Sequence, residues 1–171
     1  DVLFLLGVDE IDVPAGPFVI YQGTHGDRGA HRADVILPGA TFTEKSGLYV
    51  NTEGRVQRAN RAVFPPGDAR EDWAIIRALS GALDLPVAFD SLTALRKALY
   101  AAHPHFVILG AIEPSSASSI ETLAQAAASL TKEPFRSAIK DYHLTNAIAR
   151  ASKVMGECAA LQQTRHAVAA E

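Results

Sequence analysis

The sequence predicts an α/β fold in which a small parallel sheet and a hairpin precede a helical C-terminal tail. Three short segments, residues 2–7, 18–21 and 34–37, are apolar on both faces and are bounded by glycine, proline or acidic residues. Runs of this kind are typical of strands in a parallel sheet that helices cover on both faces. The second half of the chain is rich in alanine and places its apolar residues at helical spacing. We therefore expect a Rossmann-like layer followed by helices.

A hairpin is expected within residues 48–57. Tyrosine, valine and threonine surround the run Asn-Thr-Glu-Gly at positions 51–54, and such polar residues with a glycine suit a tight reversal. Gly54 closes the turn, so we expect it to adopt a backbone conformation that residues with side chains resist. An ion pair between Glu53 and Arg55 would hold the hairpin in shape. The alternative for Glu53 is a catalytic carboxylate.

The first helix is expected at residues 69–83. Asp68, with Glu71 three residues later, forms an acidic version of the helix-start signature. The apolar residues of this helix fall on one face, which we expect to pack on the sheet. They are Trp73, Ile75, Ile76 and Leu79.

Three further helices are expected in the second half of the chain. They begin at the capping residues Ser91, Ser118 and Thr145. The first of the three ends at His103, because a residue before proline is pushed out of the helical region. The last runs to about residue 163, and residues 113–119 and 132–140 are expected to be loops. This pattern predicts an α/β core at residues 1–89 and a helical extension at 90–171.

The composition argues against several functions. The net charge is −3 and no block of lysine and arginine occurs, so nucleic acid is not an expected partner. The longest apolar runs fall far short of the roughly 20 residues that a membrane helix needs, so no direct membrane span is expected. Cys158 is the only cysteine, and one thiolate cannot form a disulfide or supply the four ligands of an iron–sulfur cluster. No nucleophile elbow or metal-ligand spacing is present, and we expect neither catalytic nor metal-binding residues.

A glycine-containing loop at residues 23–29 is the one candidate for ligand binding. It follows an expected strand, and Gly26, Arg28 and Gly29 could bring backbone N–H groups and a cation to an anionic ligand. The spacing of dinucleotide sites is missing. The alternative is a strand-exit loop whose glycines have positive φ angles, with Arg28 and its basic neighbours in ion pairs with nearby acids such as Asp34.

Three ordered motifs resemble the signature run of the molybdopterin oxidoreductase superfamily. Residues 33–38 read ADVILP, residues 44–47 read EKSG, and residues 51–57 read NTEGRVQ. The resemblance implies a molybdopterin oxidoreductase type of fold in which these motifs have a structural role. Their marker residues are Asp34, Pro38, Glu44, Asn51, Glu53, Gly54 and Arg55.

Within that superfamily the chain is similar to the family of the large iron–sulfur subunit of respiratory complex I, and in particular to its C-terminal part. The similarity rests on residues 21–27, 49–55 and 65–73, and on residues 141–146 and 148–152 near the end. It implies a structural and assembly segment that supports electron transfer from NADH to quinone. Iron–sulfur clusters are implied upstream, and no cofactor is implied in this segment.

The resemblance also implies partners and a location. The partners would be other subunits of the complex I peripheral arm, on the cytoplasmic side of the bacterial inner membrane or the matrix side of the mitochondrial one. Active superfamily members such as formate dehydrogenases tend to carry Thr-Glu-Thr-Ala where residues 27–30 read DRGA. Two alternatives stay open: a fragment of a catalytic molybdenum oxidoreductase such as a formate dehydrogenase, and a stand-alone α/β module that binds a ligand at residues 23–29.

Overall fold

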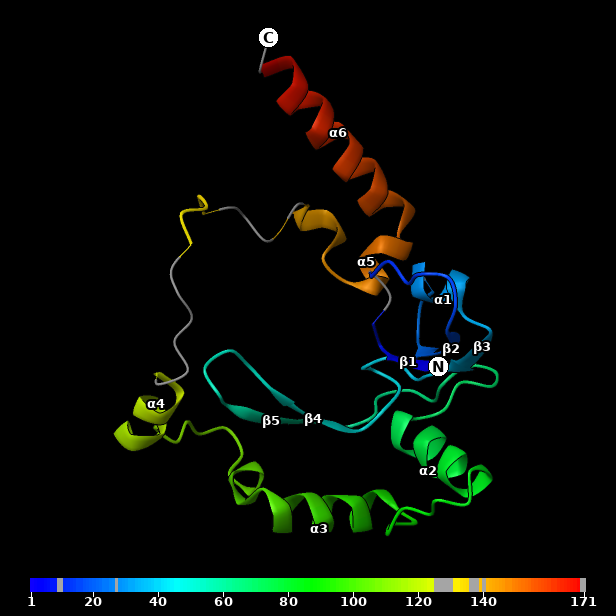
Figure 1. Cartoon of the computed structure of the whole chain (residues 1–171), viewed down its shortest axis with the longest axis vertical. Coiled ribbons are helices and arrows are strands. Elements are labelled where there is room, and N and C mark those ends of the chain that lie inside the picture. The colour runs from blue at the N-terminus through cyan, green and yellow to red at the C-terminus, as the bar shows by residue number, and fades with distance from the viewer. Residues whose placement is uncertain (9–10, 27, 125–130, 136–138, 140, 170–171) are drawn as a thin grey trace.

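A three-stranded parallel sheet forms the first part of the computed structural model (Figure 1). The structure describes residues 1–171 except 9–10, 27, 125–130, 136–138, 140 and 170–171, and the side chains of 165–169. The strands β1 (Val2–Leu6), β2 (Phe18–Gly23) and β3 (Val35–Pro38) lie in the order β1-β2-β3. All three predicted strands and their parallel arrangement are confirmed.

One face of this sheet carries the buried core. Leu5 and Tyr21 are partners in the β1–β2 register, and both are buried together with Val19. Ala30, on the short helix α1 (Arg28–Arg32), completes this cluster. The core therefore lies between the sheet and α1, as expected for an apolar strand face covered by a helix.

The opposite face of the sheet is only partly covered: Gln22, which lies on it opposite Leu6, is 0% exposed, and Phe4 and Ile20 are half-buried. Side chains alternate along a strand, so Val2, Leu6 and Phe18 lie on the other face, where they are 69%, 50% and 47% exposed. In the part of the chain that the structure describes, helices therefore cover this face only in part: the start of α2 (Asp72–Ala82) contacts Gln22, while Val2, Leu6 and Phe18 stay exposed. The apolar pattern correctly indicated parallel strands, but it cannot specify which element covers each face.

The predicted hairpin is confirmed. Strands β4 (Gly47–Val50) and β5 (Val56–Ala59) pair antiparallel. At the turn, Asn51 Oδ1 accepts hydrogen bonds from the backbone N–H groups of Glu53 (3.1 Å) and Arg55 (3.0 Å). The Glu53 and Arg55 side chains form an ion pair at 3.4 Å. Gly54 has a φ of 86°, in the region that favours glycine.

Replacing Gly54 with valine is expected to lower the free energy of unfolding by about 1 kcal/mol or more. An added Cβ at Gly54 would have no atom within 4 Å, so the loss would come from the backbone conformation alone. Thermal or urea unfolding measures the change. Gly81→Ala is the control, because Gly81 is helical, has equally open surroundings and has no positive φ. An unchanged melting curve for Gly54→Val would contradict this explanation of the turn.

Helix α2 (Asp72–Ala82) begins later than predicted. Arg70 still belongs to extended backbone, because its N–H donates to Pro38 O (3.1 Å) and its carbonyl accepts from Ala40 N–H (2.8 Å). Glu71 is the N-cap but makes no side-chain capping bond. Its carboxylate binds Trp73 Nε1 (2.9 Å) and Arg61 (3.5 Å) instead. The predicted Asp68 start signature is therefore wrong.

The apolar residues of α2 do not all face the sheet. Ile75 and Leu79 share a surface cavity with Leu37 of β3, at the end of the sheet. Trp73 lines a different cavity, which faces α3 (Leu92–Ala102). The expectation of a single sheet-packing face is correct only for part of this helix.

Helix α3 agrees with its prediction, whereas α4 begins earlier than predicted. The Ser91 side chain caps α3 by accepting from Ala94 N–H (3.1 Å), and the helix gives way at His103 to the turn η1 (Pro104–Val107). Helix α4 (Ala117–Ala124) is capped by Ser116, which accepts from Ser119 N–H at 3.3 Å. The predicted cap Ser118 is wrong, and the expected loop at 113–119 is correspondingly shorter.

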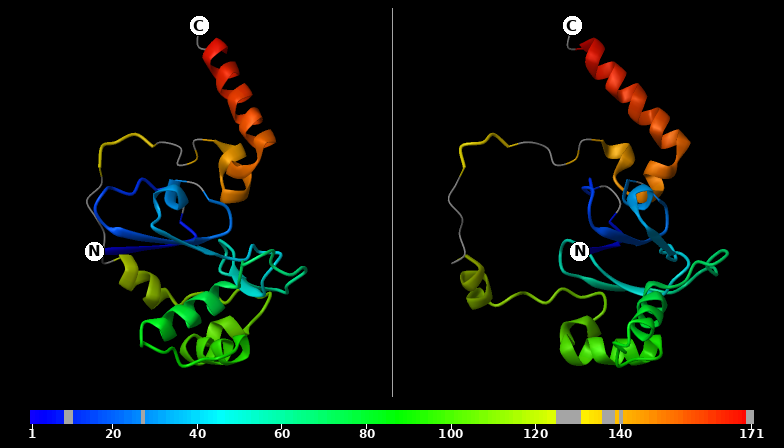
Figure 2. Two further views of the ribbon diagram at one scale, coloured as in Figure 1. Left: turned by 90° about the vertical axis from the view of Figure 1, so that its right-hand side faces the viewer. Right: turned by 45° about the vertical axis from the view of Figure 1, so that its right-hand side comes forward.

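The predicted final helix is divided into two. After the turn η2 (Tyr142–Leu144) come α5 (Ala147–Ala151) and α6 (Lys153–Ala169). Asn146 rather than Thr145 caps α5, accepting from Ala149 N–H at 2.9 Å. Ser152 is extended and its hydroxyl accepts from Met155 N–H at 3.4 Å, so it starts a second helix. Helix α6 points away from the rest of the chain in every view (Figures 1 and 2).

None of the helices that the structure describes is both long enough and apolar enough to cross a membrane.

Candidate functional site

The loop residues proposed from sequence occupy a packed, ion-paired corner. The Arg28 guanidinium lies 2.9 Å from the Asp12 carboxylate, and both side chains are mostly exposed. An added Cβ at Gly26 would lie 2.9 Å from Ala30 Cβ, and Gly29 is buried within α1. Gly26 has no positive φ, so close packing rather than a left-handed backbone explains its glycine. Gly26, Arg28 and Gly29 line neither of the two cavities described below.

Asp34 joins the start of β3 to β2. Its Oδ2 accepts a hydrogen bond from Val19 N–H at 2.7 Å, and its own N–H donates to Val19 O at 2.8 Å. Arg32 lies 3.5 Å from the same carboxylate. Two bonds to one backbone residue fix the register of the strands, which is a structural role.

Pro38 and Glu44 also shape the backbone. Pro38 ends β3 opposite Gly23 and offers its carbonyl to Arg70 N–H. Glu44 Oε2 accepts from Thr41 N–H at 3.0 Å, and Glu44 N–H donates to Thr41 O at 2.9 Å. Reciprocal bonds of this kind close a turn.

A polar network that the sequence did not single out lies at the end of β2. Gln22 is 0% exposed, and its Nε2 donates to Asp72 Oδ1 at 3.0 Å. The other Asp72 oxygen forms an ion pair with Lys45. The sequence offers one indication of this network: Gln22 is a polar residue at the end of an apolar strand, and a buried polar side chain needs a hydrogen-bond partner. Its partner comes from residue 72, which no sequence spacing could identify.

A cleft of about 390 Å³ opens beside this network. Gly7 and Gly23, which lie at the carboxyl ends of β1 and β2, line it together with Thr41, Lys45 and Asp72. In open α/β sheets, ligands bind at this edge.

The cleft residues do not fit a molybdenum pterin. Lys45 is the one cation among the described residues that line the cleft, and Asp72 neutralises it, which leaves no positive charge for a pyrophosphate. Gln22 Oε1 is buried and has no hydrogen-bond donor among the described residues. It is an uncharged acceptor, so it supplies no positive charge for a pyrophosphate either. In the described part of the chain, no group of three or more His, Cys, Asp or Glu side chains is placed to hold a metal ion.

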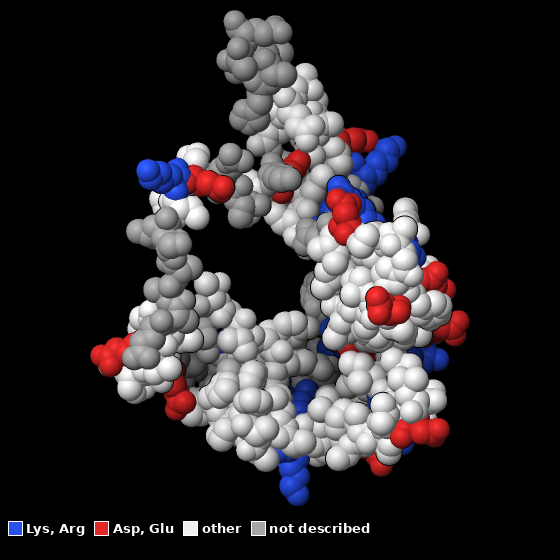
Figure 3. All heavy atoms as spheres, in the orientation of Figure 1, with Lys and Arg blue, Asp and Glu red and all other residues white. Residues whose placement is uncertain are grey.

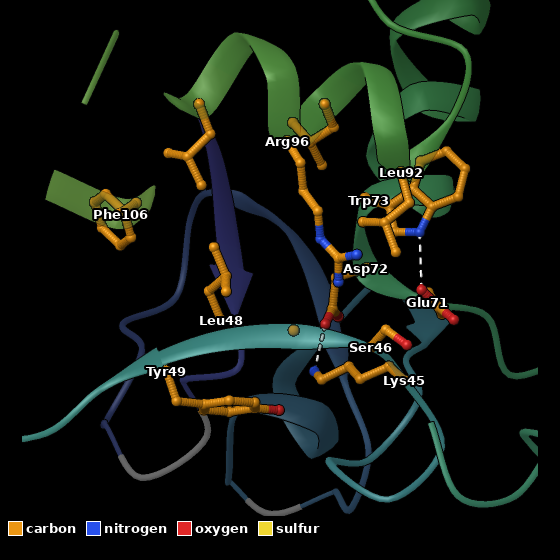
Figure 4. Close-up of a pocket in the computed structure, with 13 residues that line it drawn as sticks. Lys45, Ser46, Leu48, Tyr49, Glu71, Asp72, Trp73, Leu92, Arg96 and Phe106 are labelled. Carbon is orange, nitrogen blue, oxygen red and sulfur yellow. Dashed lines mark hydrogen bonds and ion pairs between the residues drawn. The ribbon is translucent and has the colours of Figure 1, made fainter. Parts of the chain in front are cut away.

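A second cavity of about 360 Å³ shares Lys45, Tyr49 and Asp72 with the cleft and is lined by residues of β4, α2 and α3 (Figure 4). Its walls are mainly apolar, contributed by Leu48, Trp73, Leu92, Leu95, Leu99 and Phe106. Arg96 extends from α3 into this space towards Asp72 (Figure 4).

Two protein-family models match the chain. The molybdopterin oxidoreductase model matches residues 1–82. A model of the C-terminal part of the G-type subunit of NADH-ubiquinone oxidoreductase matches residues 111–158. The first covers the parallel sheet, the hairpin and α2, and the second covers α4 to the first part of α6.

Proteins with similar sequences also carry the names of NADH-ubiquinone oxidoreductase or NADH dehydrogenase subunits. The mitochondrial NADH-ubiquinone oxidoreductase 78 kDa subunit of Candida albicans is 46% identical over 165 residues, which is 91% of this chain and 23% of the relative. The subunit of that name in Neurospora crassa is 43% identical over 95% of this chain and 23% of its own length. The mitochondrial NADH dehydrogenase [ubiquinone] iron-sulfur protein 1 of Solanum tuberosum is 41% identical over 93% and 22%.

The chain thus spans about a quarter of the length of these relatives. Their names agree with the family model that matches its second half, and the family model of its first half agrees with the parallel sheet. The chain belongs to the molybdopterin oxidoreductase superfamily and, within it, to the family of the large iron–sulfur subunit of NADH-ubiquinone oxidoreductase, respiratory complex I.

Proposed function

We propose that this chain is a shaping and docking segment of the large iron–sulfur subunit of respiratory NADH:quinone oxidoreductase. It supports electron transfer from NADH to quinone and carries out no chemistry itself. The observation that carries the proposal is the incompletely covered second face of the parallel sheet, where Val2, Leu6 and Phe18 are exposed. Contiguous apolar surface of this kind marks an interaction site.

Other exposed apolar residues support a docking role. Val154 and Leu161 of α6 are exposed, as is Ile148 of α5. On the face shown in Figure 3, most of the surface belongs to residues other than Lys, Arg, Asp and Glu. Interfaces are depleted of charged residues, so this composition favours contact with other polypeptides.

We further propose a Rossmann-like core of the molybdopterin oxidoreductase type at residues 1–89 and a helical extension at 90–171. The limits of the two family matches, residue 82 and residue 111, lie on either side of this boundary. The marker residues Asp34, Pro38, Glu44, Asn51, Glu53, Gly54 and Arg55 would then act as structural elements of the core, as their hydrogen bonds suggest.

The proposal places the cofactors outside this segment. Iron–sulfur clusters would be held by the upstream part of the subunit, because the chain has one cysteine. The partners would be other peripheral-arm subunits, on the matrix side of the mitochondrial inner membrane or the cytoplasmic side of the bacterial one. The alternative, a catalytic molybdenum oxidoreductase such as a formate dehydrogenase, is disfavoured by the cleft residues and by the names of the relatives above.

Ending the chain after Asp141 tests this docking role. The truncation removes α5 and α6, so we expect it to reduce the assembly of the subunit into its complex more than it lowers the melting temperature of residues 1–100. Native gel electrophoresis of the complex and thermal unfolding of the chain measure the two effects. Intact assembly combined with a lower melting temperature would contradict the proposal, because α6 would then serve only to stabilise its own chain.

A further inference from the structure

Arg96 places a guanidinium in the second cavity. Its Nη2 atom is buried and has no hydrogen-bond acceptor among the described residues. Figure 4 shows the side chain reaching from α3 into the cavity, above the Lys45–Asp72 pair. A buried guanidinium donor without a partner is destabilising, so this position calls for an acceptor from outside.

The two carboxylates of the cavity already have partners. Asp72 binds Lys45 and Gln22. Glu71 binds Arg61 and Trp73 Nε1. Arg96 is therefore the charged group of this cavity whose partner is missing from the described contacts.

The rest of the cavity sets the shape and polarity of an occupant. Its volume is about 360 Å³, and α3 contributes the row Leu92, Leu95 and Leu99, opposite Leu48 of β4. An occupant must therefore bring an anionic group to Arg96 and apolar atoms to the leucines. A carboxylate suits the guanidinium, because the two can form paired parallel hydrogen bonds.

We propose that this cavity receives an acidic side chain, with an aliphatic side chain next to it, from a docked polypeptide segment. The inference rests on the proposed function, which makes this chain part of a larger assembly. The matched region is 22–23% of each relative's length, so most of the polypeptide of such a subunit lies outside it. Arg96 is the specificity-determining residue of the site, and its partner is a glutamate or aspartate.

The first experiment titrates the isolated chain with octanoate, which joins a carboxylate to an aliphatic chain. Trp73 lines the cavity and is the only tryptophan, so its fluorescence and indole N–H resonance report binding locally. We expect octanoate to bind about tenfold or more tightly than octanamide, which has the same chain without the charge. Arg96→Met should remove this difference, and Arg96→Lys should keep part of it. Lys97→Met, an exposed change on the same helix, should have no effect.

The second experiment introduces the same variants into the assembled complex. Arg96→Met should lower the assembled fraction several-fold relative to Lys97→Met, while the melting temperature of the isolated chain does not fall, because the change removes a buried donor without a partner. Octanoate affinity that is the same in Arg96→Met and in the unaltered chain would overturn the proposed site. Binding that depends on Arg96, with unchanged assembly of Arg96→Met, would overturn the polypeptide occupant in favour of a free acid.

These outcomes separate the inference from the proposed function. The truncation after Asp141 could leave assembly unchanged while octanoate binding still depends on Arg96. That result would reject the docking role of α5 and α6 but would support the cavity as a binding site for an acid. Should Arg96→Met unfold the chain, Arg96→Lys supplies the comparison, since it retains the charge and loses the paired geometry.

Discussion

Replacing Asp72 with alanine is expected to lower the free energy of unfolding by about 2–4 kcal/mol, the largest effect of any single change proposed for this chain. The Gln22 amide is 0% exposed and donates to Asp72 Oδ1 at 3.0 Å. Alanine would leave this buried N–H group with only its long bond to the backbone carbonyl of residue 72 (3.5 Å) and would leave Lys45 without its anion. Urea unfolding followed by circular dichroism measures the loss.

Two further variants identify which interaction matters. Asp72→Asn keeps an acceptor for Gln22 but removes the charge for Lys45. The ion-paired side chains are 26% and 32% exposed, so water weakens the pair and we expect a loss of about 1 kcal/mol or less. Asp68→Ala, at an exposed position four residues earlier, should be close to neutral. Equal losses for the alanine and asparagine variants at position 72 would contradict the importance of the buried amide.

Replacing Asp34 with alanine is expected to lower the free energy of unfolding by about 1–3 kcal/mol. Val19 is 0% exposed, and its N–H group donates to Asp34 Oδ2 at 2.7 Å. Alanine would remove the acceptor at the start of β2, and hydrogen exchange at Val19 should accelerate with the loss of stability.

Asp12→Ala is the matched control for this change. It removes another carboxylate that pairs with an arginine, but both Asp12 and Arg28 are mostly exposed, so we expect a change within about 0.5 kcal/mol. Asp34→Asn should recover part of the stability, since its amide oxygen can accept from Val19. A loss at Asp34 no larger than that at Asp12 would contradict its role in strand register.

Local signals predicted much of the fold. The strands were evident because they are short, apolar on both faces and bounded by residues that break regular structure. The hairpin was evident because Asn51 and Gly54 carry their turn preference in their own side chains and backbone. The Ser91 cap and the end of α3 at His103 likewise depend on neighbouring residues alone.

Tertiary contacts decided the features that the sequence did not predict. Helix α2 starts late because Arg70 is held in strand pairing by Pro38, thirty-two positions earlier in the sequence. Ser152 divides the last helix by offering a second cap, a choice that apolar spacing does not reveal. Gln22 and Asp72 meet across fifty residues. Ala127 and Leu130, which we expect in the helix that begins near Ser118, lie outside the described residues.

The central claim is that this segment shapes and docks a redox subunit without holding a redox centre. Elemental analysis of the purified chain for molybdenum and iron, after incubation with pterin cofactor and with iron and sulfide, tests it most directly. The claim predicts neither metal in stoichiometric amount and no NADH-dependent dye reduction, because Lys45 in the cleft is neutralised by Asp72 and one cysteine cannot hold a cluster. Stoichiometric molybdenum in the folded chain would contradict the claim and support a catalytic molybdenum oxidoreductase.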